Sequence, residues 1–369
     1  MTLLAEIRKP DGRFASAWRF GKPILPRGEW ILLTLAVATA LAGQIVGLSS
    51  GRSTDFHVVT TVVEDLSLLG ILTLSAFLAG LLLDAAKKKS KSPTRHVLAA
   101  LSGFFYDPAR FGRALRTVAI FTLFAIGFGE LKGLAALGGF QWDEPLMHAE
   151  RWLHFGFLPH EWLSPFYDWP RAVQLVNYIY NLWYFVMIGM VLLLALRHGS
   201  PSKRFRYLCS FMATWLIGGV VMALIFSSAG PCFYGRLGFG AEYAPLMAEL
   251  GAIDKVHELY ALSTQDMLWE SFAAGKNAAA ISAFPSLHVA TATLVALFAW
   301  TSGKMLRIAG LLFLGAIMLG SVLLGWHYAL DGYAGIALAL IAWTVTGRLA
   351  QLAGVPATAS TSCLKASDR

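Results

Sequence analysis

Residues 173–196 have the sequence VQLVNYIYNLWYFVMIGMVLLLAL, which contains no charged side chain. A helix of about 20 predominantly apolar residues is long enough to cross the hydrocarbon core of a bilayer. Seven other stretches are similarly apolar, and they lie at residues 30–48, 66–83, 118–137, 207–226, 286–300, 308–324 and 329–346. The sequence therefore predicts an all-α integral membrane protein with about eight spans.

The composition of the chain excludes the common soluble classes. Of its 369 residues, 56% are hydrophobic and 14% are charged, whereas a soluble protein has about 25% charged residues. A soluble fold cannot cover so much apolar surface with so few charges. The three cysteines, Cys209, Cys232 and Cys363, lie far apart without metal-ligand spacing, so we predict no structural disulfide.

Basic residues are unevenly distributed over the segments between the predicted spans, although the whole chain has a net charge of +8. One alternate set carries +17 in total, at residues 1–29, 84–117, 197–206, 301–307 and 347–369. The other set carries −9, at residues 49–65, 138–172, 227–285 and 325–331. Lys and Arg concentrate on the cytoplasmic side of membrane proteins, so both termini are predicted to be cytoplasmic. The basic excess therefore indicates contact with membrane lipids and not with nucleic acid.

Two short polar stretches lie on the predicted outer side. Residues 283–288 have the sequence AFPSLH, and a proline at this position is typical of a helix start. A helix N-terminus with the hydroxyl of Ser286 and the imidazole of His288 is suited to binding phosphate. Residues 325–331 have the sequence GWHYALD, in which His327 and Asp331 are four apart and share one face of a helix. A carboxylate bonded to one ring nitrogen leaves the other nitrogen free to act as nucleophile or base.

Together these residues predict a phosphoryl-transfer site, in which one histidine attacks phosphorus and the other protonates the leaving oxygen. Other interpretations stay open from the residues alone. A single histidine at a helix start is commonly a cap, and a single His-x-x-x-Asp pattern is commonly structural. His288, His327 and Asp331 could also be ligands of a metal-dependent hydrolase. A transporter without catalytic activity would place its polar residues near the bilayer midplane, whereas these residues lie at one face.

The pattern Phe-Pro-Ser-Leu-His, followed about 40 residues later by His-Tyr-x-x-Asp, resembles the type 2 phosphatidic acid phosphatase superfamily. It looks most like the inositolphosphotransferase branch, which includes the fungal inositol phosphorylceramide synthases. The resemblance covers the six spans from residue 118 to residue 346, and the two N-terminal spans are an addition. It implies an enzyme that needs no metal or other cofactor and acts on a lipid phosphate, with an alcohol or water as acceptor.

The resemblance also implies a role for each motif residue. His327 would be the nucleophile that forms a phosphohistidine, and Asp331 would orient it. His288 would be the general acid for the leaving alcohol. Ser286 and the neighbouring backbone N–H groups would hold the phosphate.

The sequence departs from the phosphatase pattern in three ways. Leu287 occupies a slot where the phosphatases carry Gly and the transferase branch carries Leu. Gly320-Ser321 stands in place of an expected Ser-Arg pair, and no Lys-x6-Arg-Pro motif is recognisable. Leu287 and the missing Ser-Arg pair favour transfer of a phospho-headgroup over hydrolysis of a lipid phosphate or a polyprenyl (pyro)phosphate. They also leave the phosphate without its usual cation.

Two basic residues of the segment 227–285, Arg236 and Lys276, are candidates for the missing phosphate-binding cation. Glu130 and Lys132 lie close together in the span at 118–137. We interpret Glu130 and Lys132 as a local ion pair.

We expect four segments: a cytoplasmic N-terminal segment at 1–29, two N-terminal spans with a basic cytoplasmic loop at 30–117, a six-span catalytic core at 118–348 and a cytoplasmic tail at 349–369. The Trp-rich residues 138–172, with His148, His154 and His160, are interpreted as an interfacial segment. The length of the segment 227–285 is typical of a functional loop. We expect the protein in the plasma (inner) membrane, with its active site on the extracytoplasmic side.

Overall fold

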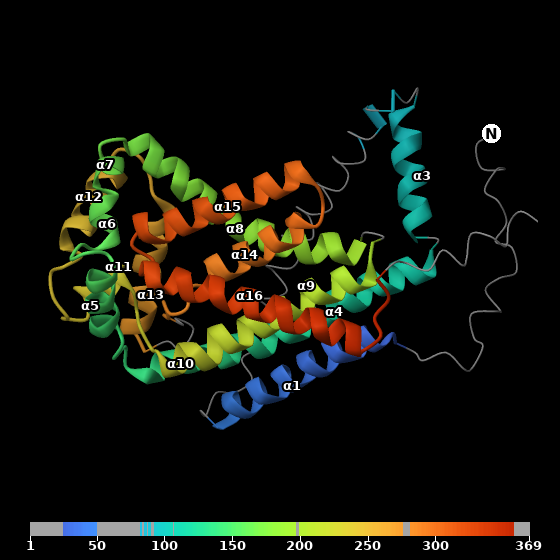
Figure 1. Ribbon diagram of the computed structural model, residues 1–369, viewed down its shortest axis with the longest axis horizontal. Helices are drawn as coiled ribbons and strands as arrows, with labels where there is room; N and C mark the ends of the chain where they lie inside the picture. The colour runs from blue at the N-terminus through green and yellow to red at the C-terminus, as the bar shows by residue number, and fades with distance from the viewer. Residues whose placement is uncertain are drawn as a thin grey trace, which may run out of the picture.

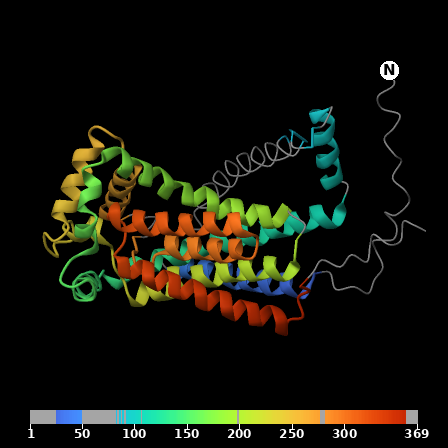
Figure 2. The same cartoon turned by 45° about the horizontal axis from the view of Figure 1, so that its top comes forward.

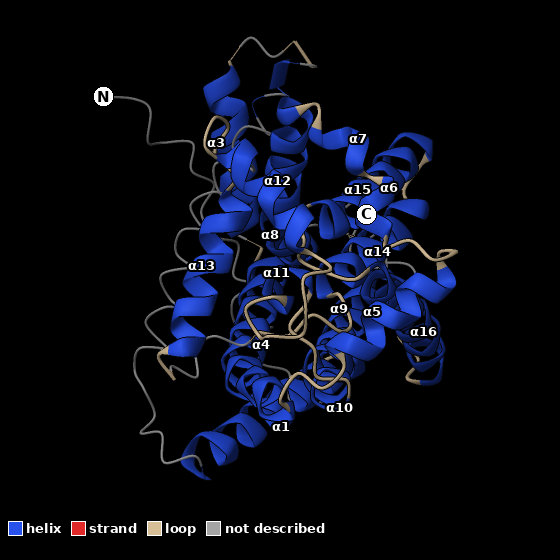
Figure 3. Ribbon diagram, turned by 90° about the vertical axis from the view of Figure 1, so that its left-hand side faces the viewer, coloured by secondary structure: helices blue, strands red, loops and turns tan. Residues whose placement is uncertain are grey.

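The computed structural model describes residues 25–49, 82, 85, 86, 88, 89, 92–105, 107–196, 199–275 and 281–357. The predicted span at 66–83, apart from residue 82, lies outside the described residues, and so does Lys276. All regular secondary structure in the described part of the chain is helical (Figures 1 and 3). The prediction of an all-α fold is therefore confirmed.

Six helical segments of the described chain are long and apolar enough to cross a membrane: Arg27–Ser49, Arg110–Ala135, Pro170–Leu196, Pro201–Ile225, Lys304–Leu323 and Ala329–Leu352. Four of these segments are single helices: α1 (Arg27–Ser49), α8 (Pro170–Leu196), α15 (Lys304–Leu323) and α16 (Ala329–Leu352). The segment Arg110–Ala135 combines most of α4 (Pro108–Lys132) with part of η2 (Gly133–Gly138). The segment Pro201–Ile225 combines α9 (Pro201–Leu216), η3 (Ile217–Met222) and α10 (Ala223–Ile225). These helices run side by side along the long axis of the molecule (Figures 1 and 2). The sequence-based assignment of an integral membrane protein agrees with this bundle.

A shorter apolar helix, α14 (Leu287–Trp300), lies in the middle of the bundle and contacts α8, α9, α15 and α16. Its 14 residues span about 21 Å, which is less than the roughly 30 Å hydrocarbon thickness of a bilayer. An α14 of this length cannot reach both rims of the bundle. The residues in its first turn, including His288, can therefore lie inside the bundle and not at its surface.

Close helix contacts fix the depth of α14. A Cβ atom added to Gly335 of α16 would lie 2.6 Å from the carbonyl oxygen of Ser286, so only glycine lets α16 approach the start of α14 this closely. Glycine lets the backbones of neighbouring membrane helices come together in this way. The same device appears where α1 crosses α4, because a Cβ on Gly127 would lie 2.5 Å from the Cα of Ala40.

Six short helices gather at one end of the bundle (Figures 1 and 3). They are α5 (Asp143–Leu153), α6 (Pro159–Trp162), α7 (Ser164–Tyr167), α11 (Pro231–Tyr234), α12 (Ala244–Asp254) and α13 (Tyr260–Ala273). Trp152 and Phe155 are exposed there, as expected for an interfacial segment, but His154 and His160 are buried. A further helix, α3 (Pro93–Phe105), lies at the opposite end.

Candidate active site

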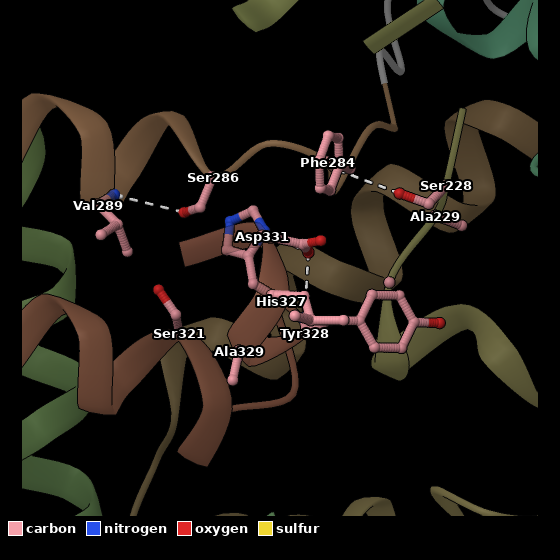
Figure 4. A network of polar contacts seen from close by, with 12 residues as sticks. Ser228, Ala229, Phe284, Ser286, Val289, Ser321, His327, Tyr328, Ala329 and Asp331 are labelled. Carbon is pink, nitrogen blue, oxygen red and sulfur yellow. Dashed lines mark hydrogen bonds and ion pairs between the residues drawn. The ribbon is translucent and has the colours of Figure 1, made fainter. Parts of the chain in front are cut away.

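The first motif forms the start of α14. Ser286 is the N-cap residue, and its hydroxyl accepts a hydrogen bond from the backbone N–H of Val289 at 3.3 Å. The preceding segment is anchored by Ser228, whose carbonyl accepts from Ala283 N–H at 2.8 Å and whose hydroxyl accepts from Phe284 N–H at 3.1 Å. Figure 4 shows the hydrogen bond between Phe284 and Ser228 beside the second motif. The capping hydrogen bond explains why the helix begins here and places His288 in its first turn.

The second motif forms the turn between α15 and α16. Nδ1 of His327 lies 3.3 Å from Oδ2 of Asp331, and the same oxygen accepts from the backbone N–H of Tyr328 at 3.0 Å (Figure 4). The backbone N–H of His327 donates to the carbonyl of Ser321 at 3.0 Å. With Asp331 as a carboxylate, Nδ1 of His327 carries the proton and Nε2 keeps its lone pair. The spacing of four residues thus gives the contact that the sequence predicts.

The structure brings the two motifs together. The backbone N–H of Ser286 donates to the carbonyl of Asp331 at 3.0 Å. The ring centroids of His288 and His327 are 5.7 Å apart, with an angle of 60° between the ring planes. Two rings at this separation can contact one phosphoryl group from different sides.

Aromatic residues of α8 hold the ring of His288. The ring of Tyr180 stacks on it at 4.7 Å between centroids, and that of Trp183 lies at 4.0 Å. These two aromatic side chains fix the orientation of the His288 ring beside the second motif. A Cβ on Gly320 would lie 2.7 Å from Cδ2 of Tyr180, so Gly320 lets this aromatic pair approach α15.

A cavity of about 240 Å³ opens next to the two histidines. Its lining is largely aromatic and apolar: Phe128, Trp183, Trp215, Phe233, Leu268, Ile281, Pro285, Leu287 and Trp326. The polar side chains that line it are His288, His327, Lys132 and Ser282. Two buried hydrogen-bond donors of the lining, Nε1 of Trp183 and Oγ of Ser282, have no partner among the described residues. The cavity thus combines an apolar wall with several unused donors.

Lys132 is the only cationic side chain in this lining, as far as the described residues go. The expected ion pair between Glu130 and Lys132 does not form. Residues two apart lie on different faces of a helix, and the carboxylate of Glu130 lies beside Gly47 of α1. Lys132 instead makes no hydrogen bond or ion pair with another described residue.

Arg236, one of the two cations predicted from the sequence, is engaged elsewhere. Its Nη2 lies 2.5 Å from Oδ1 of Asp266, and its guanidinium lies 5.7 Å from the ring centre of Trp269. Arg236 is not part of the cavity lining. Phosphate binding by Arg236 and by Lys276 stays a prediction.

Two acidic residues of α5, Asp143 and Glu150, form hydrogen bonds with the turn that carries the second motif. Sequence analysis identified neither of them. Asp143 accepts hydrogen bonds from the backbone N–H groups of Ala229 at 2.7 Å and Gly230 at 2.8 Å, and from the hydroxyl of Tyr328 at 2.7 Å. Asp143 and Glu150 are seven residues apart, which places them on one helix face. This spacing of two acids in a predicted loop is the signal that could have identified them.

Glu150 binds the start of α16. Its Oε1 accepts from the backbone N–H groups of Ala329 and Leu330, and its Oε2 accepts from the hydroxyl of Tyr243 at 3.4 Å. Burial, reinforced by the negative charge of Asp331, raises the pKa of Glu150 to about 8, although the two backbone donors act in the opposite direction. Glu150 is therefore largely protonated at neutral pH.

The pKa of His327, the candidate nucleophile, is shifted downward, in contrast to that of Glu150. Burial lowers the pKa of His327 to about 3, against a smaller opposing effect of the Ala283 carbonyl, and the charge of Lys132 adds to the lowering. His327 is consequently a neutral imidazole at physiological pH. Only the neutral ring has a nitrogen lone pair available for attack.

The geometry agrees with one comparison. A family model described as PAP2 superfamily matches residues 144–345, which is more than half of the chain. The matched range includes His288, His327 and Asp331, but it begins after Lys132 and Asp143. No curated protein matches the chain, and no solved structure matches it either.

Proposed function

The chain belongs to the PAP2 superfamily, and we propose that it is a membrane phosphotransferase that moves a phosphate-bearing headgroup from a lipid donor to an alcohol acceptor. The family supports the coarser assignment, an enzyme of the lipid phosphatase or phosphotransferase type. One observation carries the proposal: His288, His327 and Lys132 line the same cavity of about 240 Å³, and His327 contacts Asp331.

The proposed reaction has two steps. Nε2 of His327 donates its lone pair to the phosphorus of the bound lipid, while the bond from phosphorus to the leaving oxygen breaks. His288 gives a proton to that oxygen, which leaves as a neutral alcohol and forms a phosphohistidine at His327. In the second step His288 takes the proton of the acceptor hydroxyl, whose oxygen attacks phosphorus and releases His327. Asp331 holds the Nδ1–H of His327 in both steps.

Charge on the non-bridging phosphate oxygens is balanced by fixed donors. The ammonium of Lys132, the hydroxyl of Ser282 and the indole N–H of Trp183 line the cavity without partners in the described chain. The start of α14, capped by Ser286, adds the positive end of a helix dipole. Donors that are already in place strengthen as charge develops in the transition state. The headgroup would sit among these residues while the lipid tails stay in the bilayer.

Leu287 supports transfer over hydrolysis, in the manner of the inositolphosphotransferase branch. Its side chain lines the cavity and lies close to Gly218 and Gly219 of the π-helical turn η3. π-Helical turns are frequent at functional sites. A leucine here, together with the aromatic lining, keeps the acceptor side of the cavity apolar and disfavours water as acceptor. Hydrolysis of a lipid phosphate or a polyprenyl (pyro)phosphate is the second candidate, because members of the superfamily are generally phosphatases.

The charge distribution supports an orientation for the proposed enzyme. The start of α1 and the end of α16 meet at the end of the bundle opposite the short helices, where a Cβ on Gly28 would lie 3.3 Å from the side chain of Val355. The described parts of the basic segments, at residues 25–29, 107–117, 199–206, 301–307 and 347–357, lie at that same end, so it would face the cytoplasm. The catalytic cavity would then open on the extracytoplasmic side of the plasma (inner) membrane.

The test uses purified full-length protein with a panel of labelled lipid phosphates, with and without alcohol acceptors. A new lipid with an exchanged headgroup supports transfer, and released phosphate supports hydrolysis. His327→Ala and His288→Ala should each abolish turnover, and acid-labile label should form on the wild type but not on His327→Ala. Activity that is lost in chelator and restored by a divalent ion would favour the metal-dependent reading instead. Near-normal turnover in His327→Ala would refute the assignment of His327 as the nucleophile.

A further inference from the structure

A second cavity, of about 300 Å³, lies at the other end of the bundle. It is bounded by Phe298 and Thr301, at the C-terminal end of α14, and by residues of α4 and α9. His288 stands in the first turn of α14, and Thr301 directly follows its last residue. The two cavities are therefore about 20 Å apart along this helix.

Three cationic side chains line this second cavity: Arg113 of α4, and Lys203 and Arg204 of α9. No acidic side chain belongs to its described lining. The carboxylate of Glu29, which does not line the cavity, is shared by Arg204 at 3.2 Å and Arg116 at 2.8 Å. One carboxylate thus faces several guanidinium groups, and the cavity keeps an excess of positive charge.

Some of these nitrogen atoms are buried without a partner. Nε and Nη2 of Arg113 make no hydrogen bond in the described structure, and neither does Nε of Arg204. Asp107 exerts an attraction on Arg113, but its Oδ1 accepts from the backbone N–H of Arg110. The terminal nitrogens of Arg204 donate to Glu29 and Thr117, so the unpartnered donors belong mainly to Arg113. Buried N–H groups without an acceptor are costly, and they indicate an acceptor that the protein itself does not supply.

The backbone contributes little to this cavity. At the start of α9, Lys203 N–H donates to the hydroxyl of Ser200, and Ser202 N–H donates to the carbonyl of Pro356. The amide groups of this helix start are already bonded, so recognition there depends on the side chains. Guanidinium groups present several N–H donors in a plane that matches phosphate oxygens.

We propose that this cavity binds the phosphate of an anionic ligand, which is delivered either by a phospholipid headgroup of the adjacent leaflet or by a free phosphate. Basic pockets between membrane helices are suited to anionic headgroups. The bound phosphate would accept from Arg113 and Arg204 at its inner side and from Lys203 at the rim. It would connect α4, α9 and the turn after α14, where Nζ of Lys203 already donates to the carbonyl of Thr301 at 3.2 Å.

The first arm of the test measures lipid binding by native mass spectrometry on delipidated full-length protein. Phosphatidylglycerol should bind at least about tenfold more tightly than phosphatidylcholine, and Arg113→Gln should remove this preference. Arg307→Gln is the matched control, because Arg307 lies at the same end, stacks on Trp300 and does not line the cavity. Equal binding by Arg113→Gln and Arg307→Gln would overturn the proposal.

The second arm separates the two sources of phosphate. Inorganic phosphate should raise the unfolding temperature of the detergent-solubilised wild type, relative to chloride at equal ionic strength, only if the site accepts free phosphate. A preference for phosphatidylglycerol without this shift assigns the site to the lipid headgroup. Absence of both effects refutes the site.

Two further variants keep the test decisive. If Arg113→Gln does not fold, Lys203→Glu replaces it and must weaken the binding of phosphatidylglycerol. Lys304→Glu is its control and must leave that binding unchanged. Both lysines are exposed at this end of the bundle, and only Lys203 lines the cavity. The variant His327→Ala must keep the preference for phosphatidylglycerol. A loss in His327→Ala would show that the lipid occupies the catalytic cavity instead. Because the readout is binding and not turnover, the result is independent of the proposed reaction.

Discussion

Replacing Lys132 by glutamine tests the proposed phosphate-binding set most directly. Lys132 lines the cavity beside both histidines, and it makes no hydrogen bond or ion pair with another described residue. A cation held without a partner contributes little to folding but is available to an anionic substrate. Lys132→Gln should therefore leave the unfolding temperature unchanged or raised while it reduces turnover.

The size of the loss follows from the contact that disappears. A hydrogen bond to a charged group contributes about 1.5–3 kcal/mol. At about 1.4 kcal/mol for each factor of ten, this corresponds to a decrease of about 10- to 150-fold in kcat/KM. The largely aromatic lining of the cavity strengthens electrostatic attraction and favours the upper part of that range. Lys132→Arg keeps the charge and should recover part of the loss.

The assay compares kcat and KM of the wild type, Lys132→Gln and Arg236→Gln on the same labelled lipid phosphate. Arg236 is the matched control, because it lies outside the cavity lining and pairs with Asp266. We expect at most a twofold change for Arg236→Gln. The reasoning fails if Arg236→Gln loses activity while Lys132→Gln keeps it, since the cation would then be the one that the sequence alone indicated.

Three more predictions concern the supports of the site. Asp331→Asn should lower kcat by about 100-fold or more, because an amide stabilises the wrong tautomer of His327, and pre-steady-state labelling should show slower phosphohistidine formation with little change in KM. Glu150 has a folded pKa of about 8, above its unfolded value near 4.5, so its contribution to stability is fully present below about pH 4.5 and is lost as pH rises to about 8. Glu150→Gln should flatten the fall in unfolding temperature between pH 5 and pH 8. If the variant shows the same dependence of unfolding temperature on pH as the wild type, the titration of buried Glu150 is not the cause of that fall. Gly335→Ala should cost about 1–3 kcal/mol, measured by thermal unfolding, because its Cβ would overlap the carbonyl of Ser286, whereas Gly315→Ala, with open space around it, should be neutral.

Sequence patterns were informative wherever a structural feature depends on residues that are close together in the chain. Apolar length located the described spans, because every backbone polar group in a bilayer must be satisfied within a helix. The four-residue spacing of His327 and Asp331 predicted their contact, which forms across the start of α16, because His327 precedes the N-cap residue Tyr328 and Asp331 lies in the first turn. The start of α14 is likewise local, because the hydroxyl of Ser286 caps the backbone N–H of Val289, three residues further along the chain.

Residues that act through distant packing were not predictable in the same way. The ring of His288 is held by Tyr180 and Trp183, about a hundred positions earlier in the chain, and aromatic residues at a span end equally fit an interfacial belt. Glu150 lies in a segment that is polar enough to resemble a surface loop, yet it is buried against the start of α16. These contacts depend on how the short helices fold over the bundle.

Lys132 shows most clearly how the N-terminal part of the chain enters the site. It ends α4, before the range matched by the family model, and α4 is set in place by its crossing with α1. At this crossing a Cβ on Gly43 would lie 2.6 Å from the carbonyl of Gly127, so the two helix backbones are in direct contact. A shift of α1 along α4 is prevented by this contact and by the ion pair between Glu29 and Arg116 at 2.8 Å. The first helix therefore fixes the depth at which Lys132 meets the two histidines, although it contributes no side chain to the cavity.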